Sequence, residues 1–311
     1  MRYPVGNIFH LHIMHGIFKL FSLTPALMLS ALILSGCVSG NKCAENGELK
    51  VCQFNMRYPV KNDGPQKDGS CVWEKRAPLI SSLFKYHEVD VCGSQELNKK
   101  QIDDLMADLK EYAVFGTAVV PDNEKCHNNV IFYRKDRLEL LDSGVFWLSE
   151  TPEKMSSGWD SQGRRRNTNW GKFRDKKSGK TFYLFSSHFD HIGKTARIEA
   201  AKLLAKKIAE IAKGETFFAM GDYNSTPDSA AIAEIKKSGF MFDSYEHSLT
   251  VPYGPYRTFN NYLPDGNIKT RIDYIFTSQD VAVKKYAVIS DTNGRVYPSD
   301  HYPIIIHSEI K

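Results

Sequence analysis

Six short polar groups in this 311-residue chain combine carboxylates, amides and imidazoles, and each stands where an apolar stretch ends or begins. In chain order, their members are Asn55, Gln95-Glu96, His188, Asp222 with Asn224, Asp273, and Asp300-His301. In α/β proteins, side chains at strand ends meet at one edge of a sheet, where ligands bind. Each group alone is more often a turn or a solvated surface residue. All six together, in this order, predict one shared site.

The residue types favour metal-assisted chemistry on a phosphate ester. Carboxylate and amide oxygens suit a hard cation such as Mg²⁺ or Mn²⁺, and Glu96 is the best single candidate ligand. Asp222 could orient and deprotonate water, while Asn224 could donate to a phosphoryl oxygen. Histidine can bind such an oxygen near neutral pH. A cation and donors around developing negative charge are what phosphoryl transfer requires.

Short apolar strands and amphipathic helices are predicted to position these groups. Strand 49–54 ends at Asn55, and strand 89–93 ends just before Gln95-Glu96. Helical periodicity predicts helices over 73–86, 101–109, 195–211 and 229–237. Further strands are predicted over 113–119, 130–133, 138–148, 170–173, 181–187, 217–220, 271–276, 281–289 and 302–307. Because no linker divides them, we expect one α/β domain over residues 48–311.

The N-terminal 36 residues are typical of a secretory signal. Basic residues precede an apolar run over 21–34, and the run ends in Leu34-Ser35-Gly36-Cys37. This ending resembles the bacterial lipoprotein signal, so Cys37 is the expected lipidation site and residues 37–47 the expected tether. The alternatives are an uncleaved anchor or a secreted protein without lipid. We expect a location in the cell envelope, facing the periplasm, with the membrane as a partner through the anchor.

The net charge argues against a high-affinity nucleic-acid binder, and the remaining cysteines argue against a zinc site. A net charge of +5 fits an anionic substrate but is low for a high-affinity nucleic-acid binder. The cysteines match no zinc spacing. An oxidising compartment permits disulfides, and Cys71 and Cys126, both in polar segments, are a candidate pair. Cys52 and Cys92 stand in apolar strands and are expected to be buried.

The order of the six groups resembles the endonuclease/exonuclease/phosphatase superfamily, nearest to its bacterial deadenylase-like branch. The likeness covers the chain after the tether, and its supporting segments are 62–64 with Trp73 and Arg76, Ile131-Phe132-Tyr133, 146–152, and 188–191 with Ala196-Arg197. One departure is His127, where relatives often carry an acidic residue. The resemblance implies a four-layer α/β sandwich: two mixed β-sheets face to face, with helices outside.

The resemblance also implies roles for single residues. Glu96 would hold the metal with help from Asn55, and Asp300 would lie beside it. Two arginines are candidate substrate contacts: Arg57, which closely follows Asn55, and Arg166, which relatives often keep. Their neighbours Arg164 and Arg165 are expected to be solvated surface residues.

The implied catalytic residues lie later in the chain. Asp222 would activate the attacking water, and Asn224 and His188 would contact the scissile phosphate. His301 would bind or protonate that phosphate, with Asp273 as its carboxylate partner. This set predicts a metal-dependent phosphoric ester hydrolase.

The substrate class has more than one interpretation. The first is a phosphodiesterase or nuclease-type hydrolase that uses Mg²⁺ or Mn²⁺ and acts as a monomer. The alternative is a phospholipid head-group or sugar-phosphate phosphatase of the same fold. An inactive, membrane-anchored binding protein would typically have lost Glu96, Asp222 or one histidine, and the chain retains all of them.

Overall fold

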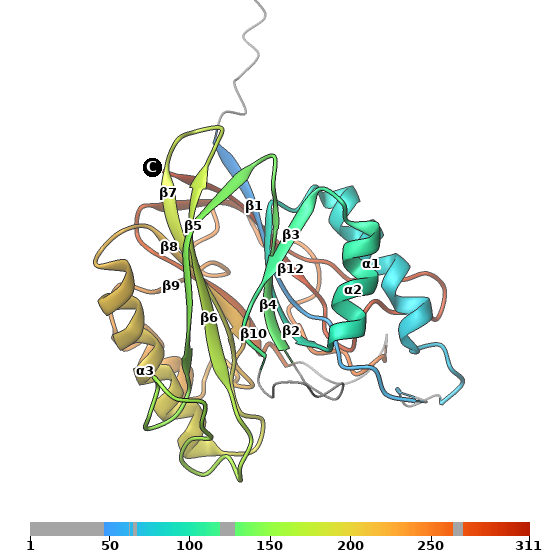
Figure 1. Ribbon diagram of the computed structural model, residues 1–311, viewed down its shortest axis with the longest axis horizontal. Helices are drawn as coiled ribbons and strands as arrows, with labels where there is room; N and C mark the ends of the chain where they lie inside the picture. The colour runs from blue at the N-terminus through green and yellow to red at the C-terminus, as the bar shows by residue number, and fades with distance from the viewer. Residues whose placement is uncertain (1–46, 62, 65–66, 119–127, 264–269) are drawn as a thin grey trace, which may run out of the picture. The chain divides into compact units, whose positions relative to one another are not determined.

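The computed structural model describes residues 47–311 except 62, 65–66, 119–127 and 264–269 (Figure 1). The predicted signal, Cys37 and almost all of the tether lie outside these residues, as do Cys126 and His127. Within the described part of the chain, no helix has the length and apolar character needed to cross a membrane.

Two six-stranded mixed sheets form the centre of the domain. The first has the strand order β11-β12-β1-β2-β4-β3, and the second has the order β5-β6-β7-β8-β10-β9. Strands β1 and β2 run parallel, as do β7 and β8, and the other neighbours are antiparallel. The first sheet contains β1 (Glu48–Asn55), β2 (Val91–Leu97), β3 (Tyr112–Phe115), β4 (Asn128–Arg134), β11 (Val281–Val288) and β12 (Ile304–Ile310). The second contains β5 (Leu138–Trp147), β6 (Asn167–Asp175), β7 (Thr181–His188), β8 (Phe217–Asp222), β9 (Phe242–Asp243) and β10 (Asp273–Thr277).

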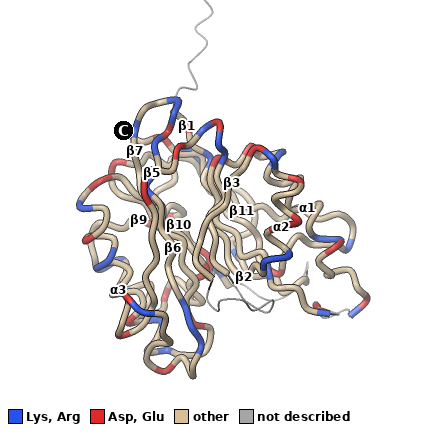
Figure 2. Tube along the Cα trace, viewed as in Figure 1, with Lys and Arg blue, Asp and Glu red and all other residues tan. Residues whose placement is uncertain are grey.

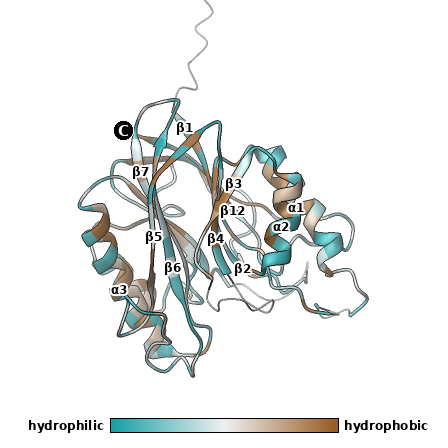
Figure 3. Ribbon diagram, viewed as in Figure 1, coloured by the Kyte–Doolittle hydropathy of each residue, from teal (hydrophilic) through white to brown (hydrophobic). Residues whose placement is uncertain are grey.

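In the described part of the chain, four helices cover the outer faces of the sheets. They are α1 (Trp73–His87), α2 (Lys99–Asp108), α3 (Lys194–Ala212) and α4 (Ala230–Lys237). Helices α1 and α2 lie outside the first sheet and α3 lies outside the second (Figure 1). The helices carry both hydrophobic and hydrophilic residues, as half-buried elements should (Figure 3). The predicted four-layer sandwich of two mixed sheets is therefore confirmed.

Apolar residues fill the three spaces between these layers. Val51 and Val91 belong to a cluster between the two sheets, together with Leu184 and Phe218 from the second sheet. Cys52, the next residue along β1, belongs instead to the cluster under α1 and α2. A third cluster packs α3 and α4 against the second sheet. Because successive strand side chains point to opposite faces, each central strand stabilises two layers.

The cysteines follow the predictions in part. Cys52 and Cys92 are register partners on β1 and β2 and are fully buried, as predicted. Cys71 is a free thiol in the described structure, and its candidate partner Cys126 lies outside the described residues. Cys71 is buried and packs in the cluster between the sheets.

Candidate active site

The strands place most of the predicted side chains at one edge of the sandwich. Asp222, the last residue of β8, is the register partner of both His188 on β7 and Asp273 on β10. In the facing sheet, Asn55 ends β1 beside Gln95 of β2. Asn55 reaches across to Asp222, so both sheets contribute to one cluster.

Asp222 stands at the centre of this cluster. Its Oδ2 accepts a hydrogen bond from Asn55 Nδ2 at 3.0 Å, and its Oδ1 accepts one from the backbone N–H of Asn224 at 2.9 Å. Nε2 of His188 lies 3.5 Å from Oδ2, and Nε2 of His301 lies 3.8 Å from it. Burial raises the pKa of Asp222 to about 7. A carboxylate with such a pKa is suited to general-base catalysis near neutral pH.

Glu96 is presented to the cluster by an irregularity in β2. The register between β2 and β4 shifts after Ser94, and Glu96 adopts the left-handed backbone conformation with φ of 68°. Bulges of this kind re-aim side chains next to active sites. Its carboxylate accepts hydrogen bonds from Asn55 Nδ2 at 3.1 Å and from the backbone N–H of Tyr58 at 3.2 Å. Glu96 therefore lies in β2 itself, three residues beyond the end of the predicted strand and within reach of Asp222.

The cluster contains two groups of side chains that could hold a metal ion. Their ligand atoms lie within 4.8 Å of one another, and the groups are Glu96 with His188 and Asp222, and Asp222 with Asp273 and His301. Carboxylate oxygens dominate both groups, and no cysteine takes part, which fits a hard divalent cation. Asp300 belongs to neither group, although the sequence predicted it beside the metal.

Arg57 connects Asp300 to the rest of the cluster. Its Nε lies 2.8 Å from Asp63 Oδ2 and 3.6 Å from Asp300 Oδ2, and its Nη1 lies 3.9 Å from Glu96 Oε2. Arg57 thus acts as a counter-ion for three carboxylates in this structure. Burial raises the pKa of Asp300, and the positive charges of His301 and Arg57 oppose that rise.

His301 and Asp273 form the predicted pair. Nδ1 of His301 lies 2.8 Å from Asp273 Oδ2, and both side chains are buried. Burial alone would lower the pKa of His301, but Asp273 and then Asp222 raise it to about 10. His301 is therefore a cation at neutral pH, and it can stabilise negative charge on a phosphoryl oxygen.

Asn224 lies beside Asp222, but its side chain is engaged with the backbone. Its Nδ2 donates to the carbonyl oxygen of Phe189 at 3.0 Å, and its backbone has a φ of 45°. The predicted contact with the scissile phosphate would therefore use the second N–H of Nδ2 or need a rotated amide, because Oδ1 can only accept.

The arginine segment after β5 divides into three different environments. Nη1 of Arg166 lies 3.0 Å from His188 Nδ1, so Arg166 belongs to the cluster. Arg164 is not simply solvated as predicted, because its Nε donates to the buried carboxylate of Asp190 at 2.9 Å. Arg165 is exposed, as predicted.

Two buried residues support Asp273, and the sequence analysis did not place one of them, Gln53, in the site. Gln53 Nε2 donates to Asp273 Oδ1 at 3.3 Å and also to Gln95 Oε1 at 2.5 Å. Thr258 Oγ1 accepts hydrogen bonds from the backbone N–H groups of Ile272 and Asp273, both at 3.0 Å. A glutamine inside an apolar strand was a usable signal for Gln53, because buried amides need partners.

Thr258 links β10, which carries Asp273, to the segment before β12 that carries His301. Besides holding the backbone of Asp273, its carbonyl oxygen accepts from the N–H of Tyr302 at 2.6 Å, and Phe259 forms a β-bridge with His301. The hydroxyl is fully buried, so its loss leaves two N–H groups without that acceptor.

Thr258→Val is expected to lower kcat about tenfold while KM changes little, because misalignment of a catalytic pair raises the barrier by about 1–2 kcal/mol. Thr258→Ser keeps the hydroxyl and should retain most of the activity. Steady-state kinetics of both variants test this. Equal kcat values for the valine and serine variants would contradict the role of the hydroxyl.

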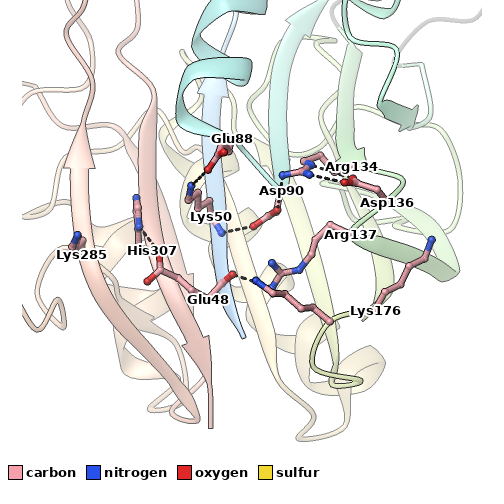
Figure 4. A pocket seen from close by; sticks show the side chains of 11 residues that line it. Glu48, Lys50, Glu88, Asp90, Arg134, Asp136, Arg137, Lys176, Lys285 and His307 are labelled. Atoms are coloured by element: carbon pink, nitrogen blue, oxygen red, sulfur yellow. Dashed lines mark hydrogen bonds and ion pairs between the residues drawn. The ribbon is translucent and has the colours of Figure 1, made fainter. Parts of the chain in front are cut away.

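A separate cavity of about 670 Å³ lies at the opposite edge of the sandwich, where β1 begins (Figure 4). Its charged side chains largely pair with one another: Lys50 with Glu88 at 2.5 Å, and Arg134 with Asp136 at 2.6 Å. None of the residues of the catalytic cluster lines it. The predicted site residues therefore lie away from this cavity, at the other edge.

Comparison with known proteins agrees with this geometry. Residues 52–301 match the Endonuclease/Exonuclease/phosphatase family, and the chain belongs to this family. A structure of a family member from Bacteroides thetaiotaomicron is 34% identical, with a TM-score of 0.79, and the match covers 85% of this chain and 98% of that one. A mannosyl-6-phosphatase from the same organism is 33% identical, with a TM-score of 0.77, over 84% of this chain and 99% of that one.

Two relatives of lower sequence identity support the fold but not a more specific function. The human Nocturnin catalytic domain is 18% identical, with a TM-score of 0.66 over 85% of this chain and 95% of that one, which shows a shared fold alone. An uncharacterised protein of Acanthamoeba polyphaga mimivirus is 27% identical over 179 residues. That match covers 54% of this chain and 65% of that protein, slightly less than two thirds of its length. Because family members hydrolyse phosphoric esters, the chain is a phosphoric ester hydrolase.

Proposed function

We propose that this chain is a Mg²⁺- or Mn²⁺-dependent phosphatase that removes phosphate from a sugar-phosphate monoester. The observation that supports hydrolysis is the placement of Asp222, a buried carboxylate with a pKa near 7, between His188 and His301. The likeness to a mannosyl-6-phosphatase over 84% of the chain supports the monoester. This likeness therefore favours a sugar-phosphate phosphatase, which the sequence analysis gave as the alternative to a phosphodiesterase.

The roles of the chain's own residues follow from their contacts. Glu96 and Asn55 would hold the ion, which supplies a positive charge that polarises a phosphoryl oxygen. Asp222 accepts the proton of the attacking water while the water oxygen bonds to phosphorus. The bond from phosphorus to the sugar oxygen breaks, and that oxygen leaves as a hydroxyl group after taking a proton from solvent water. The cationic ring of His301 stabilises the negative charge on the phosphoryl oxygens.

The charge distribution also favours a small substrate. Lysine and arginine are interspersed with acidic residues along the trace seen in Figure 2. A nucleic-acid surface instead gathers basic residues in one patch or stripe. We therefore rank a phosphodiester such as nucleic acid second.

We also propose that the enzyme is a monomer anchored in the cell envelope through a lipid on Cys37. The sequence Leu34-Ser35-Gly36-Cys37 after an apolar run supports this. Metabolic labelling with a radioactive fatty acid, for the natural chain and for Cys37→Ser, tests it.

The expected result of a first assay is release of inorganic phosphate from mannose 6-phosphate in the presence of Mg²⁺ or Mn²⁺. Bis-p-nitrophenyl phosphate should be hydrolysed more slowly, and EDTA should stop both reactions because the carboxylate cluster then lacks its cation. Faster cleavage of the diester would favour the phosphodiesterase. If neither substrate were hydrolysed with Mg²⁺ or Mn²⁺, the result would favour the inactive, membrane-anchored binding protein.

A further inference from the structure

Arg166 lies between two histidine rings. Its Nη1 is 3.0 Å from Nδ1 of His188, and its Nη2 is 3.1 Å from Nδ1 of His191. The two histidines bracket Phe189 and Asp190, which follow β7 directly. One planar guanidinium group therefore contacts the same nitrogen of both rings.

The chemistry of arginine determines which nitrogen carries the proton in each ring. A guanidinium group has five N–H donors and no acceptor, and it stays protonated in proteins. Each Nδ1 must therefore act as the acceptor, which a neutral imidazole can do only when its proton is on Nε2. The contacts exclude both the Nδ1–H tautomer and the doubly protonated ring while they persist.

Neighbouring groups keep the arginine in this place. Arg166 is only 12% exposed, and its Nε is buried with no hydrogen-bond partner among the described residues. Asp190 is 4.0 Å away, and its carboxylate accepts instead from Arg164 at 2.9 Å and from the backbone N–H of Gly193 at 2.6 Å. Because Asp190 is already engaged, the two rings are the main partners of Arg166.

We propose that Arg166 is a positioning residue that fixes His188 and His191 in the Nε2–H tautomer, so that both present an N–H donor to the substrate. Nε2 of His188 lies 3.5 Å from Asp222 Oδ2, so in this tautomer the ring presents a proton to the cluster and is not itself a ligand of the ion that Glu96 and Asn55 would hold. His191 is exposed at the rim, where its N–H can meet an oxygen of the substrate. That the two histidines donate hydrogen bonds to the substrate rests on the proposed function. The tautomers of the two rings rest only on their contacts with Arg166.

This inference separates the two buried histidines of the site chemically. His301 faces Asp273 through its Nδ1 and is a cation, whereas His188 faces an arginine through its Nδ1 and is neutral. His188 can therefore donate a hydrogen bond to the phosphate throughout the reaction, but a neutral ring is too weak an acid to protonate a leaving group.

Nuclear magnetic resonance of the ¹⁵N-histidine-labelled full chain tests the tautomers directly. Long-range ¹H–¹⁵N correlations distinguish the two neutral tautomers and the cation, and His188→Gln and His191→Gln assign the two signals. We expect both rings in the Nε2–H form at neutral pH. A ring of His188 protonated on Nδ1, or on both nitrogens, would overturn the proposal without any need for an arginine variant.

Substitution then tests the cause. Arg166→Gln should give His188 a mixture of tautomers, because an amide can accept as well as donate, and should lower kcat at least about tenfold. Arg165→Gln, in the same segment but exposed, is the matched control and should leave tautomers and kcat unchanged. Unchanged tautomers in Arg166→Gln would overturn the proposal. If both rings of the natural chain were in the Nε2–H form but the chain hydrolysed no phosphate ester, the role of Arg166 would be supported. Only the proposed function would then be contradicted.

Discussion

Asp222→Asn is expected to lower kcat by about three orders of magnitude, because it removes the group that takes the proton from the attacking water. Steady-state release of phosphate at saturating metal measures the effect.

The stability of this variant should not fall. Burial raises the pKa of Asp222 to about 7, which means that the folded state disfavours its charged form. A neutral amide removes that penalty above the ordinary pKa of aspartate, so Tm at pH 8 should be equal or higher. Asp228→Asn is a suitable control, because Asp228 is exposed and bonds only to Thr226 nearby. A kcat within a few-fold of the natural value would exclude Asp222 as the base.

Glu96→Gln is expected to weaken the affinity for Mg²⁺ and to lower the rate at limiting Mg²⁺ by about a hundredfold or more, because a hard cation binds a carboxylate better than a neutral amide. The fold should persist, since glutamine Oε1 can still accept from Asn55 Nδ2. Titration of the rate with Mg²⁺ and Mn²⁺ measures the apparent affinity.

Glu88→Gln provides the matched control for that experiment. Glu88 is exposed, pairs with Lys50, and lines the cavity at the opposite edge of the sandwich. Its removal should leave the metal titration unchanged. If Glu96→Gln and Glu88→Gln gave the same titration curve, Glu96 would not be a ligand.

The sequence predicted the layers and most of the site because both depend on local patterns. Short apolar strands ending in polar residues indicated where Asn55, His188 and Asp222 stand, and parallel strands bring such ends to one edge. The order of the same residues indicated the family. Helix α3 was recognised because its apolar residues recur with helical spacing along a long segment.

Features that depend on distant contacts could not be predicted. The left-handed conformation of Glu96 arises where β2 and β4 lose register, and the sequence of β2 alone does not reveal its partner. The salt bridge of Arg164 joins residues far apart along the chain, which made a run of arginines look solvated. The two-residue strand β9 was missed because it forms only where Asp243 pairs with β10 and its carboxylate binds Arg271.

Strand β1 joins opposite edges of the domain, with Glu48 at the charged cavity and Asn55 in the catalytic cluster. Eight residues of extended chain span about 25 Å. Whatever is joined to the chain before Glu48 is therefore attached at the edge away from the chemistry. The enzyme should for this reason tolerate immobilisation through its N-terminal side on a resin or a bead, where its catalytic edge would stay accessible to dissolved substrate.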